Sequence, residues 1–387
     1  MLGWTSDKGR SGGRTLIAVG RDETGVRPTN ARASAVATAP SIQFCRAGDE
    51  EELAAFDGCM GGSPSRPEYW RWKYFENPAG EGCVAVARVG GEIVGRMGFL
   101  PFRTRVQARG MVGAQQVDVA ILPEHRRGGI YFQLAHATIA EGAKRGIAFG
   151  FGFATEETRA LSTDFLGFSL VGSVHRLVKV LDYLHYAGRL LGLPGSRMFR
   201  GSPPPRGRTA RPPALEGGMT RVDRFDEPFD HLAFDVTLGR VMVVRDAAYL
   251  NWRYVDCPTV AYRRYAARTE GALRGFVVFH AYEDAGVVRG VIDELVCPPD
   301  DPDLVKSLLS VAFSDLRAEG AINAICWLPA WHPLGTRLRA LGFRDRQARN
   351  HLIVLPNTPD VVEAAHLVED RNWYYTHGDS DYHMGSV

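Results

Sequence analysis

The feature that most constrains the fold is an internal repeat whose parts keep a nearly constant spacing. The stretch WKYFENP at 72–78 is matched by WRYVDCP at 252–258. At the same offset, GGEIVGRMGF at 90–99 is matched by EGALRGFVVF, and LGF recurs near the end of each half. Because ordered matches at a fixed period indicate a duplicated unit, the sequence predicts two copies of one fold.

Composition then predicts where the two units begin and end. Prolines, glycines and arginines crowd residues 183–222, where neither a helix nor a central strand can persist, so we interpret this stretch as a linker. Residues 1–40 are rich in small and polar residues without periodicity, which predicts a disordered leader. The expected units are therefore 41–182 and 223–356, followed by a C-terminal tail at 357–387.

Charge, cysteine content and hydropathy exclude several classes of function. The 387 residues include 46 basic and 44 acidic side chains, so the balance of +2 gives no reason to expect a nucleic-acid partner. The six cysteines form no CxxC pair and no Cys/His cluster, so we expect no metal site and a reducing compartment. We find neither a signal-peptide pattern nor an apolar run of about 20 residues, so we expect a cytoplasmic protein without a membrane span.

The periodicity of the first half predicts an α+β fold in α/β layers. Short alternating or apolar runs predict strands, and apolar spacing of three and four predicts helices. The expected strands are 41–47, 83–88, 92–102, 115–122, 147–153 and 169–181, and the expected helices are 49–60, 129–144 and 156–166. We therefore expect two similar units, each a mixed, mostly antiparallel twisted sheet flanked by helices.

The segment most informative about function is VDVAILPEHRRGGIY at 117–131. It predicts a strand that enters a helix through a basic loop with two glycines. Small residues allow backbone N–H groups to converge on a phosphate, and the helix dipole adds positive potential at the same place. Such a loop suits a pyrophosphate. The alternative is a solvated loop that only caps the helix.

This segment resembles the signature of the GNAT superfamily, the Gcn5-related N-acetyltransferases, which is Arg/Gln-x-x-Gly-x-Gly/Ala at a helix start. Pro123, Arg126 and Gly129 stand in the expected places, whereas Tyr131 replaces the third small residue. The resemblance covers both halves in strand order, but the signature occurs only in the first. In the second half, 293–302 puts acidic side chains where phosphates would sit, so we expect no cofactor there.

The resemblance implies that acetyl-CoA or another acyl-CoA binds to the first unit and that an amine attacks its thioester. Pantetheine would follow the strand at 115–122, the pyrophosphate would meet backbone amides of the loop, and an N–H near Val119 or Ala120 would donate to the developing oxyanion. The implied cofactor-binding residues are Val119, Ala120, Ile121, Leu122, Arg126, Arg127, Gly128, Gly129, Ile130 and Tyr131.

Candidates for acid–base chemistry lie on the same strand and in the tail. Asp118 is the candidate catalytic base, and a satisfied strand-end carboxylate is the alternative. The position where many family members carry a tyrosine acid holds Thr163, so the thiolate would leave unassisted or take a proton through water. We expect the tail to fold over the cleft, where Asp379 and Asp381 would bind the substrate; packing that closes the domains is the alternative.

These observations predict an acyltransferase of the GNAT type, an acyl-CoA-dependent N-acetyltransferase acting on a small amine. An amino sugar or an amino acid derivative is the expected acceptor, and analogy with long two-unit relatives suggests surface polysaccharide biosynthesis. Two alternatives stay open. One is an aminoacyl-tRNA-dependent peptide-bridge ligase of related fold, and the other is a non-catalytic acyl-CoA-binding or scaffold protein.

Overall fold

The computed structural model describes residues 39–60, 65–190, 218–236, 241–346, 349–357 and 361–381. Nearly all of the predicted leader and residues 191–217 of the predicted linker lie outside the described residues. The elements of the first half are β1 (Ser41–Phe44), α1 (Glu50–Cys59), α2 (Pro67–Trp70), η1 (Arg71–Phe75), β2 (Cys83–Val89), β3 (Glu92–Val106), β4 (Arg109–Ile121), η2 (Pro123–His125), α3 (Ile130–Lys144), β5 (Phe149–Ala154), α4 (Glu156–Phe165), β6 (Ser169–Ser173), β7 (Arg176–Val180) and α5 (Tyr183–Leu190). Those of the second half are β8 (Met219–Arg221), α6 (Glu227–Val236), β9 (Val241–Val243), α7 (Ala247–Tyr254), β10 (Arg263–Thr269), β11 (Ala272–Asp284), β12 (Val287–Val296), α8 (Pro302–Ala318), β13 (Asn323–Trp327), α9 (Leu334–Ala340), β14 (Arg344–Arg346), β15 (His351–Pro356), α10 (Val361–Leu367), η4 (Asp370–Asn372) and η5 (His377–Asp379).

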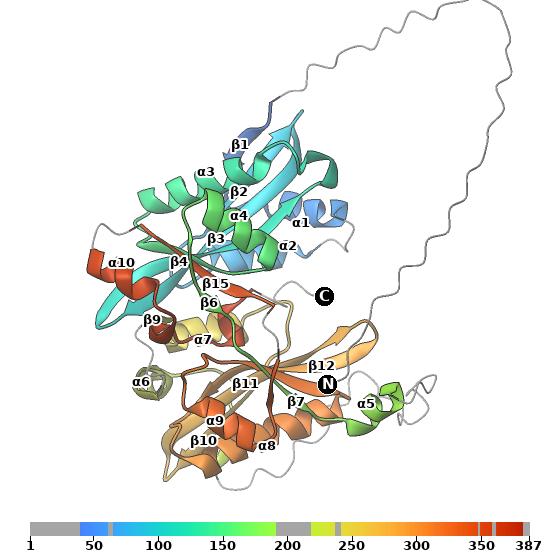
Figure 1. Ribbon diagram of the computed structural model, residues 1–387, viewed down its shortest axis with the longest axis vertical. Helices are drawn as coiled ribbons and strands as arrows, with labels where there is room; N and C mark the ends of the chain where they lie inside the picture. The colour runs from blue at the N-terminus through green and yellow to red at the C-terminus, as the bar shows by residue number, and fades with distance from the viewer. Residues whose placement is uncertain are drawn as a thin grey trace, which may run out of the picture. The chain divides into compact units, whose positions relative to one another are not determined.

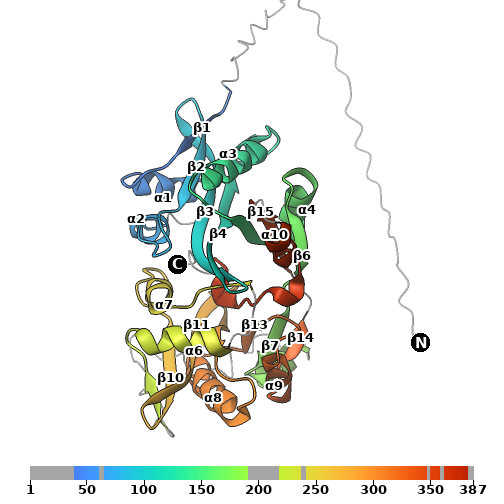
Figure 2. The same ribbon diagram turned by 90° about the vertical axis from the view of Figure 1, so that its left-hand side faces the viewer.

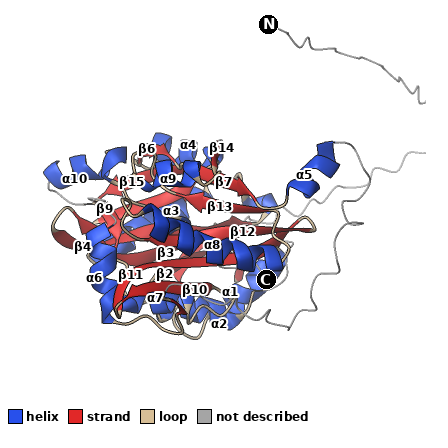
Figure 3. Ribbon diagram, turned by 90° about the horizontal axis from the view of Figure 1, so that it is seen from below, coloured by secondary structure: helices blue, strands red, loops and turns tan. Residues whose placement is uncertain are grey.

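The described strands form two sheets of the same design. Their orders are β1-β2-β3-β4-β5-β15-β6, with β9 added beside β3, and β14-β7-β13-β12-β11-β10-β8. The pairs β4–β5 and β12–β13 are parallel, and the other pairs in the described part of the chain are antiparallel. Helix α3 packs on β2 and β3, and α8 packs on β10 and β11 (Figure 1, Figure 2). This is the predicted fold class, two mostly antiparallel sheets flanked by helices (Figure 3).

Each sheet takes strands from the other half of the sequence, and one of them is β9, which pairs with β3 of the first sheet. Strand β15 lies between β5 and β6 in the first sheet, and β7 lies between β13 and β14 in the second. Figure 1 shows the green β7 among the orange strands of the second half. The division into 41–182 and 223–356 stays a prediction about independently folding domains, and the two sheets do not follow it.

The prediction of a single strand over 169–181 is therefore wrong. This stretch forms two strands, β6 and β7, which belong to different sheets. Between them the backbone N–H of Val174 donates to the carbonyl of Asn350 at 2.9 Å, and that of His175 donates to the hydroxyl of Tyr375 at 3.0 Å. The alternation of apolar residues continues through the crossing, so periodicity alone does not reveal it.

Equivalent residues of the repeat meet where the two halves join. The indole rings of Trp72 and Trp252 stack with centroids 4.9 Å apart, and both are buried. Each indole N–H donates to the backbone carbonyl of the other tryptophan, at 2.8 and 2.9 Å. Such reciprocal contact is typical of a two-fold interface between identical patches. Trp72, in the aromatic stretch at 69–75, thus packs where the two halves join.

The described tail is part of the core. Trp373 and Tyr375 belong to the apolar cluster that both halves share, and Tyr374 belongs to that of the second sheet. The backbone N–H of Tyr374 donates to the carbonyl of Val241 at 2.9 Å. Within the described residues, no helix has the length and apolar character needed to span a bilayer.

Candidate functional site

Strands β4 and β5 separate halfway along β4. They pair in parallel only from Gly113–Phe149 to Gln115–Phe151; among the residues that the structure describes, their ladder ends there. Strand β4 continues to Ile121, so 116–121 presents one row of backbone polar groups that this neighbour does not pair. Because such groups need hydrogen-bonding partners, the opening suits a ligand with amide groups of its own.

Two exposed apolar residues lie on elements next to this opening. Val119 on β4 is 40% exposed, and Phe165 is 65% exposed on α4, which packs on β5. Ring contact with Phe132 places Phe165 against α3, with centroids 5.5 Å apart. Exposed apolar surface on neighbouring elements often marks a binding surface.

The opening ends at the start of α3, which has the form of an anion site. Gly129 adopts a φ of 71°, a left-handed conformation that glycine takes without steric cost. The backbone N–H of Phe132 donates to the carbonyl of Gly129 at 3.1 Å, so the N–H groups of Ile130 and Tyr131 precede the first hydrogen bond of the helix. Free N–H groups and the helix dipole together favour a phosphate.

Two side chains of the signature have hydrogen-bonding partners on neighbouring elements. The Nε of exposed Arg126 donates to the carbonyl of Ile121 at 3.2 Å, which fastens the loop to the end of β4. The hydroxyl of Tyr131 lies 3.1 Å from the Oγ of Ser162, and burial raises the pKa of Tyr131. The tyrosine that replaces a small residue therefore extends toward α4.

The predicted catalytic residue Asp118 lies on a β-bulge of β4. Asp118 and Val119 together face the single residue Met97 of β3. Asp118 has a φ of 54°, a left-handed conformation that Asp and Asn tolerate better than other side chains. Bulges beside active sites commonly redirect a side chain in this way.

The Asp118 carboxylate is held by two neighbours in the sequence, Lys73 and Tyr74. It lies 2.7 Å from the Nζ of Lys73 and accepts a hydrogen bond from the Tyr74 hydroxyl at 2.5 Å. The Lys73 side chain is 0% exposed, and its Nζ also donates to the hydroxyl of Tyr69 at 3.0 Å. A β-carbon at Gly98 would overlap the Tyr74 hydroxyl, so the absence of a side chain there makes room for it.

Electrostatics keep Asp118 ionised. Burial raises the pKa of its carboxyl, but the charge of Lys73 and then that of Arg96 lower it, and the net result is a pKa below the usual value. Burial also lowers the pKa of Lys73, whereas Asp118 and Tyr69 raise it to a net value above the usual one. Lys73 and Asp118 are thus a buried, charged ion pair.

The two acidic residues predicted in the tail lie in different surroundings. Asp381 lies 3.7 Å from the Nζ of Lys73, with 27% of its side chain exposed. Burial raises the pKa of Asp381 more than Lys73 lowers it. Asp379 is buried and lies 2.5 Å from Arg245. The structure therefore brings Asp381, but not Asp379, to Asp118; binding of substrate by either stays a prediction.

Sequence reasoning missed Lys73 and Tyr74 as site residues because they lie in an aromatic stretch that indicates packing. One signal was available, since a lysine is unusual between two buried aromatic side chains. Thr163, at the expected tyrosine position, bonds to the carbonyl of Ala160 at 3.4 Å and to Asp164 at 3.0 Å. Among the described residues, no group of His, Cys, Asp and Glu is arranged to hold a metal ion.

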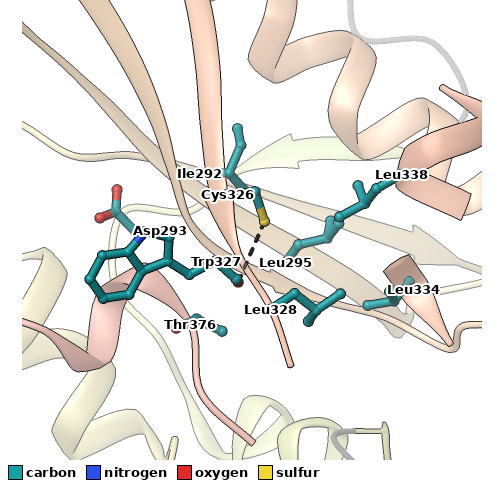
Figure 4. Close-up of a pocket in the computed structure, with 9 residues that line it drawn as sticks. All are labelled: Ile292, Asp293, Leu295, Cys326, Trp327, Leu328, Leu334, Leu338 and Thr376. Atoms are coloured by element: carbon teal, nitrogen blue, oxygen red, sulfur yellow. Dashed lines mark hydrogen bonds between the residues drawn. The ribbon is translucent and has the colours of Figure 1, made fainter. Parts of the chain in front are cut away.

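The second sheet has a similar opening, and its own side chains fill it. Pairing of β12 with β13 ends at Ile292–Cys326. Figure 4 shows the small pocket beyond this point, lined by Ile292, Asp293, Leu295, Cys326, Trp327, Leu328, Leu334, Leu338 and Thr376. The start of α8 is capped by Asp301, whose carboxylate accepts from the backbone N–H of Leu304 at 3.0 Å. A carboxylate therefore takes the place that a phosphate would occupy.

Comparisons with known proteins concern the sequence of the first half and the fold of the chain. Residues 46–164 match the family model of the acetyltransferase (GNAT) domain. A probable N-acyltransferase from Enterococcus faecalis V583 is 13% identical, with 82% of this chain and 72% of that chain covered and a TM-score of 0.55. A GCN5-related N-acetyltransferase from Anabaena variabilis is also 13% identical, with 81% and 72% covered and a TM-score of 0.54. N-myristoyltransferase of Saccharomyces cerevisiae, solved with myristoyl-CoA, is 12% identical, with 81% and 82% covered and a TM-score of 0.53.

At these identities the likeness to solved structures concerns the fold. No curated protein matches the sequence.

Proposed function

We propose that this chain, whose residues 46–164 match the family model of the acetyltransferase (GNAT) domain, transfers an acyl group from acyl-CoA to the amine of a small acceptor. The observation that carries the proposal is that two binding surfaces adjoin. The part of β4 that β5 does not pair, 116–121, leads directly to the start of α3, which none of the described side chains caps. A long ligand with amide groups and a diphosphate at its end matches this sequence of surfaces.

The residues that would hold acyl-CoA follow from that match. Backbone groups of Val119 to Leu122 would pair with pantetheine, and the N–H groups of Gly129 to Tyr131 would receive the diphosphate. Arg126 lies in the same loop, whereas the N–H of Gly128 already donates to the carbonyl of His125 at 3.2 Å. The ligand supplies an activated thioester. The N–H of Val119 or Ala120, at the bulge, would donate to the oxygen on which negative charge develops.

The charges around the bulge favour an amine acceptor. Asp118 and Asp381 lie 2.7 and 3.7 Å from the Nζ of Lys73, so these three groups carry more negative than positive charge when both carboxyls are ionised. Such a site attracts a cationic amine and offers carboxylates for its protons. The acidic cluster also favours transfer over mere binding of acyl-CoA, although Thr163 supplies no acid for the thiolate. We propose Asp118 as the carboxylate that orients the amine.

The second half is proposed to bind no acyl-CoA. Its opening is filled by buried leucines, and Asp301 already caps the helix that would meet a diphosphate. One site per chain follows.

Release of free thiol from acetyl-CoA across a panel of amino sugars and amino acid derivatives tests the proposal. We expect release with at least one amine. Arg126→Glu should raise the dissociation constant of acetyl-CoA about 10- to 100-fold, because a carboxylate would oppose the phosphates. The matched control is Arg274→Glu on β11, an exposed arginine far along the chain, which should leave that constant unchanged.

Binding of acetyl-CoA without thiol release by any amine would instead identify a non-catalytic acyl-CoA-binding protein. Equal loss of affinity in both arginine variants would contradict the placement of the diphosphate.

A further inference from the structure

Two features found at Asp118, a β-bulge and a buried tyrosine that donates to a carboxylate, also occur in the second half. Strand β12 carries a bulge against β11, where Asp293 is the extra residue between the pairs Val278–Glu294 and Phe279–Ile292. The hydroxyl of Tyr254 donates to Glu294 at 2.8 Å, as that of Tyr74, its counterpart in the repeat, donates to Asp118. The second half thus retains the form of an acceptor site.

This second site is filled by Thr376–Asp381, which we call the C-terminal segment. The carbonyl of Gly378 accepts from the Nε of Arg253 at 3.2 Å and from the hydroxyl of Tyr249 at 3.3 Å. The carbonyl of Ser380 accepts from the same guanidinium at 3.3 Å. Arg245 binds the hydroxyl of Thr376 at 3.1 Å and the carboxylate of Asp379 at 2.5 Å.

The fit between the segment and the site leaves no space for a side chain at Gly378. A β-carbon there would overlap the hydroxyl of Tyr254 and would lie 2.8 Å from an oxygen of Glu294. The segment is also buried from Thr376 to Ser380. The second site therefore fits the backbone of the C-terminal segment, and this segment of the same chain occupies it.

The segment leads from the second site into the first. Arg253 and Lys73 are counterparts in the repeat, and they contact consecutive residues of the segment. Arg253 holds the carbonyl of Ser380, and the Nζ of Lys73 lies 3.7 Å from the carboxylate of Asp381. Fixing the segment in one site thus fixes one carboxylate in the other.

We propose that the degenerate second site is a receptor for the chain's own C-terminal segment, and that it holds Asp381 as the base for the acceptor amine. This inference rests on the proposed function. The amine nitrogen bonds to the thioester carbon, the carbon–sulfur bond breaks, and the electron pair leaves with the thiolate of CoA. Asp381 takes the proton that the nitrogen loses.

Asp381 suits this role better than Asp118. Asp118 already accepts from two donors, and its pKa is lowered. Asp381 contacts Lys73 at the longer distance and is partly exposed, so an amine can reach it. The titratable groups whose charges act on Asp381 or respond to it are Lys73, Asp118, Arg253, Tyr69 and Tyr74.

The first experiment compares steady-state kinetics of the full chain with those of Asp381→Asn. We expect kcat to fall about 10²- to 10⁴-fold, the range for loss of a general base, while the dissociation constant of acetyl-CoA stays unchanged. The matched control is Glu369→Gln, an exposed acidic residue of the same tail, which should keep full activity. Asp381→Glu should restore part of kcat, and the acidic limb of the pH profile should vanish in Asp381→Asn.

The second experiment tests the receptor without an activity readout. Hydrogen–deuterium exchange of the wild type should show protected amides from Tyr374 to Ser380, and Gly378→Ala should remove that protection. Rapid exchange of this segment in the wild type would overturn the receptor assignment.

The outcomes distinguish this inference from the proposed function. A wild type that releases thiol together with an equally active Asp381→Asn overturns the inference alone. A wild type that releases none with any amine overturns the proposed function and the inference with it.

Discussion

Replacing Lys73 by Met should destabilise the protein strongly, because Lys73 is a fully buried cation. Its Nζ lies 2.7 Å from Asp118 and 3.0 Å from the hydroxyl of Tyr69. Attraction of unit charges at that separation is about 6 kcal/mol for an effective dielectric constant of about 20. Desolvation of the lysine offsets part of it. Breaking a buried pair from one side therefore should cost about 3–5 kcal/mol of the free energy of unfolding.

Urea unfolding of four proteins measures this cost: the wild type, Lys73→Met, Asp118→Asn and the double variant. Asparagine tolerates the left-handed backbone of position 118, so Asp118→Asn tests charge rather than strain. The free energy of unfolding of the double variant should exceed that of Lys73→Met by at least about 2 kcal/mol, because the double variant buries no unpaired charge. The matched control Lys306→Met, on the exposed face of α8, should change stability by under about 0.5 kcal/mol. Additive effects of the two single substitutions would refute the buried ion pair.

Two further predictions concern the repeat-related tyrosine sites. Gly98→Ala should push the Tyr74 hydroxyl away from Asp118 and cost about 1–3 kcal/mol in urea unfolding, whereas Gly110→Ala, where a β-carbon meets open space, should not; equal stability of the two would contradict the packing. Burial raises the pKa of Glu294 from 4.5 to about 7, so the folded protein holds a proton that the unfolded chain releases. Stability should then fall by about 3 kcal/mol as pH rises from 4.5 to 7. Unfolding across that range in Glu294→Gln should lack this component, and identical pH dependence of variant and wild type would contradict it.

The local sequence pattern was enough to predict most elements of the first half. It was not enough to predict which strands pair. The run FGFGFA in β5 indicates a strand buried on both faces, and all six of its residues are buried. Periodicity does not reveal the exchange of β7 and β15 between the sheets. Alternation of apolar residues indicates which face of the sheet a side chain lies on, but not which strand lies beside it. The repeat predicted two similar sheets correctly, but a repeat does not reveal which copy supplies each strand.

The candidate site was predictable where its chemistry is local. The loop at 123–131 and Asp118 lie within one strand–helix connection, where small residues and charge have a direct physical meaning. Lys73 and Tyr74 come from an aromatic stretch 44 residues earlier than Asp118, and only folding brings them together. Asp379 and Asp381 of the tail were both predicted to bind the substrate. The structure buries Asp379 against Arg245 and leaves Asp381 partly exposed. This difference could not be predicted, because Arg245 belongs to no motif.

A crystal structure of the full chain grown with coenzyme A tests the central claim most directly. We predict one molecule per chain, with pantetheine between β4 and β5 and the diphosphate on the N–H groups of Gly129 to Tyr131. Coenzyme A bound beside β12 and α8, or bound elsewhere while the opening at 116–121 stays free, would contradict a single site in the first half.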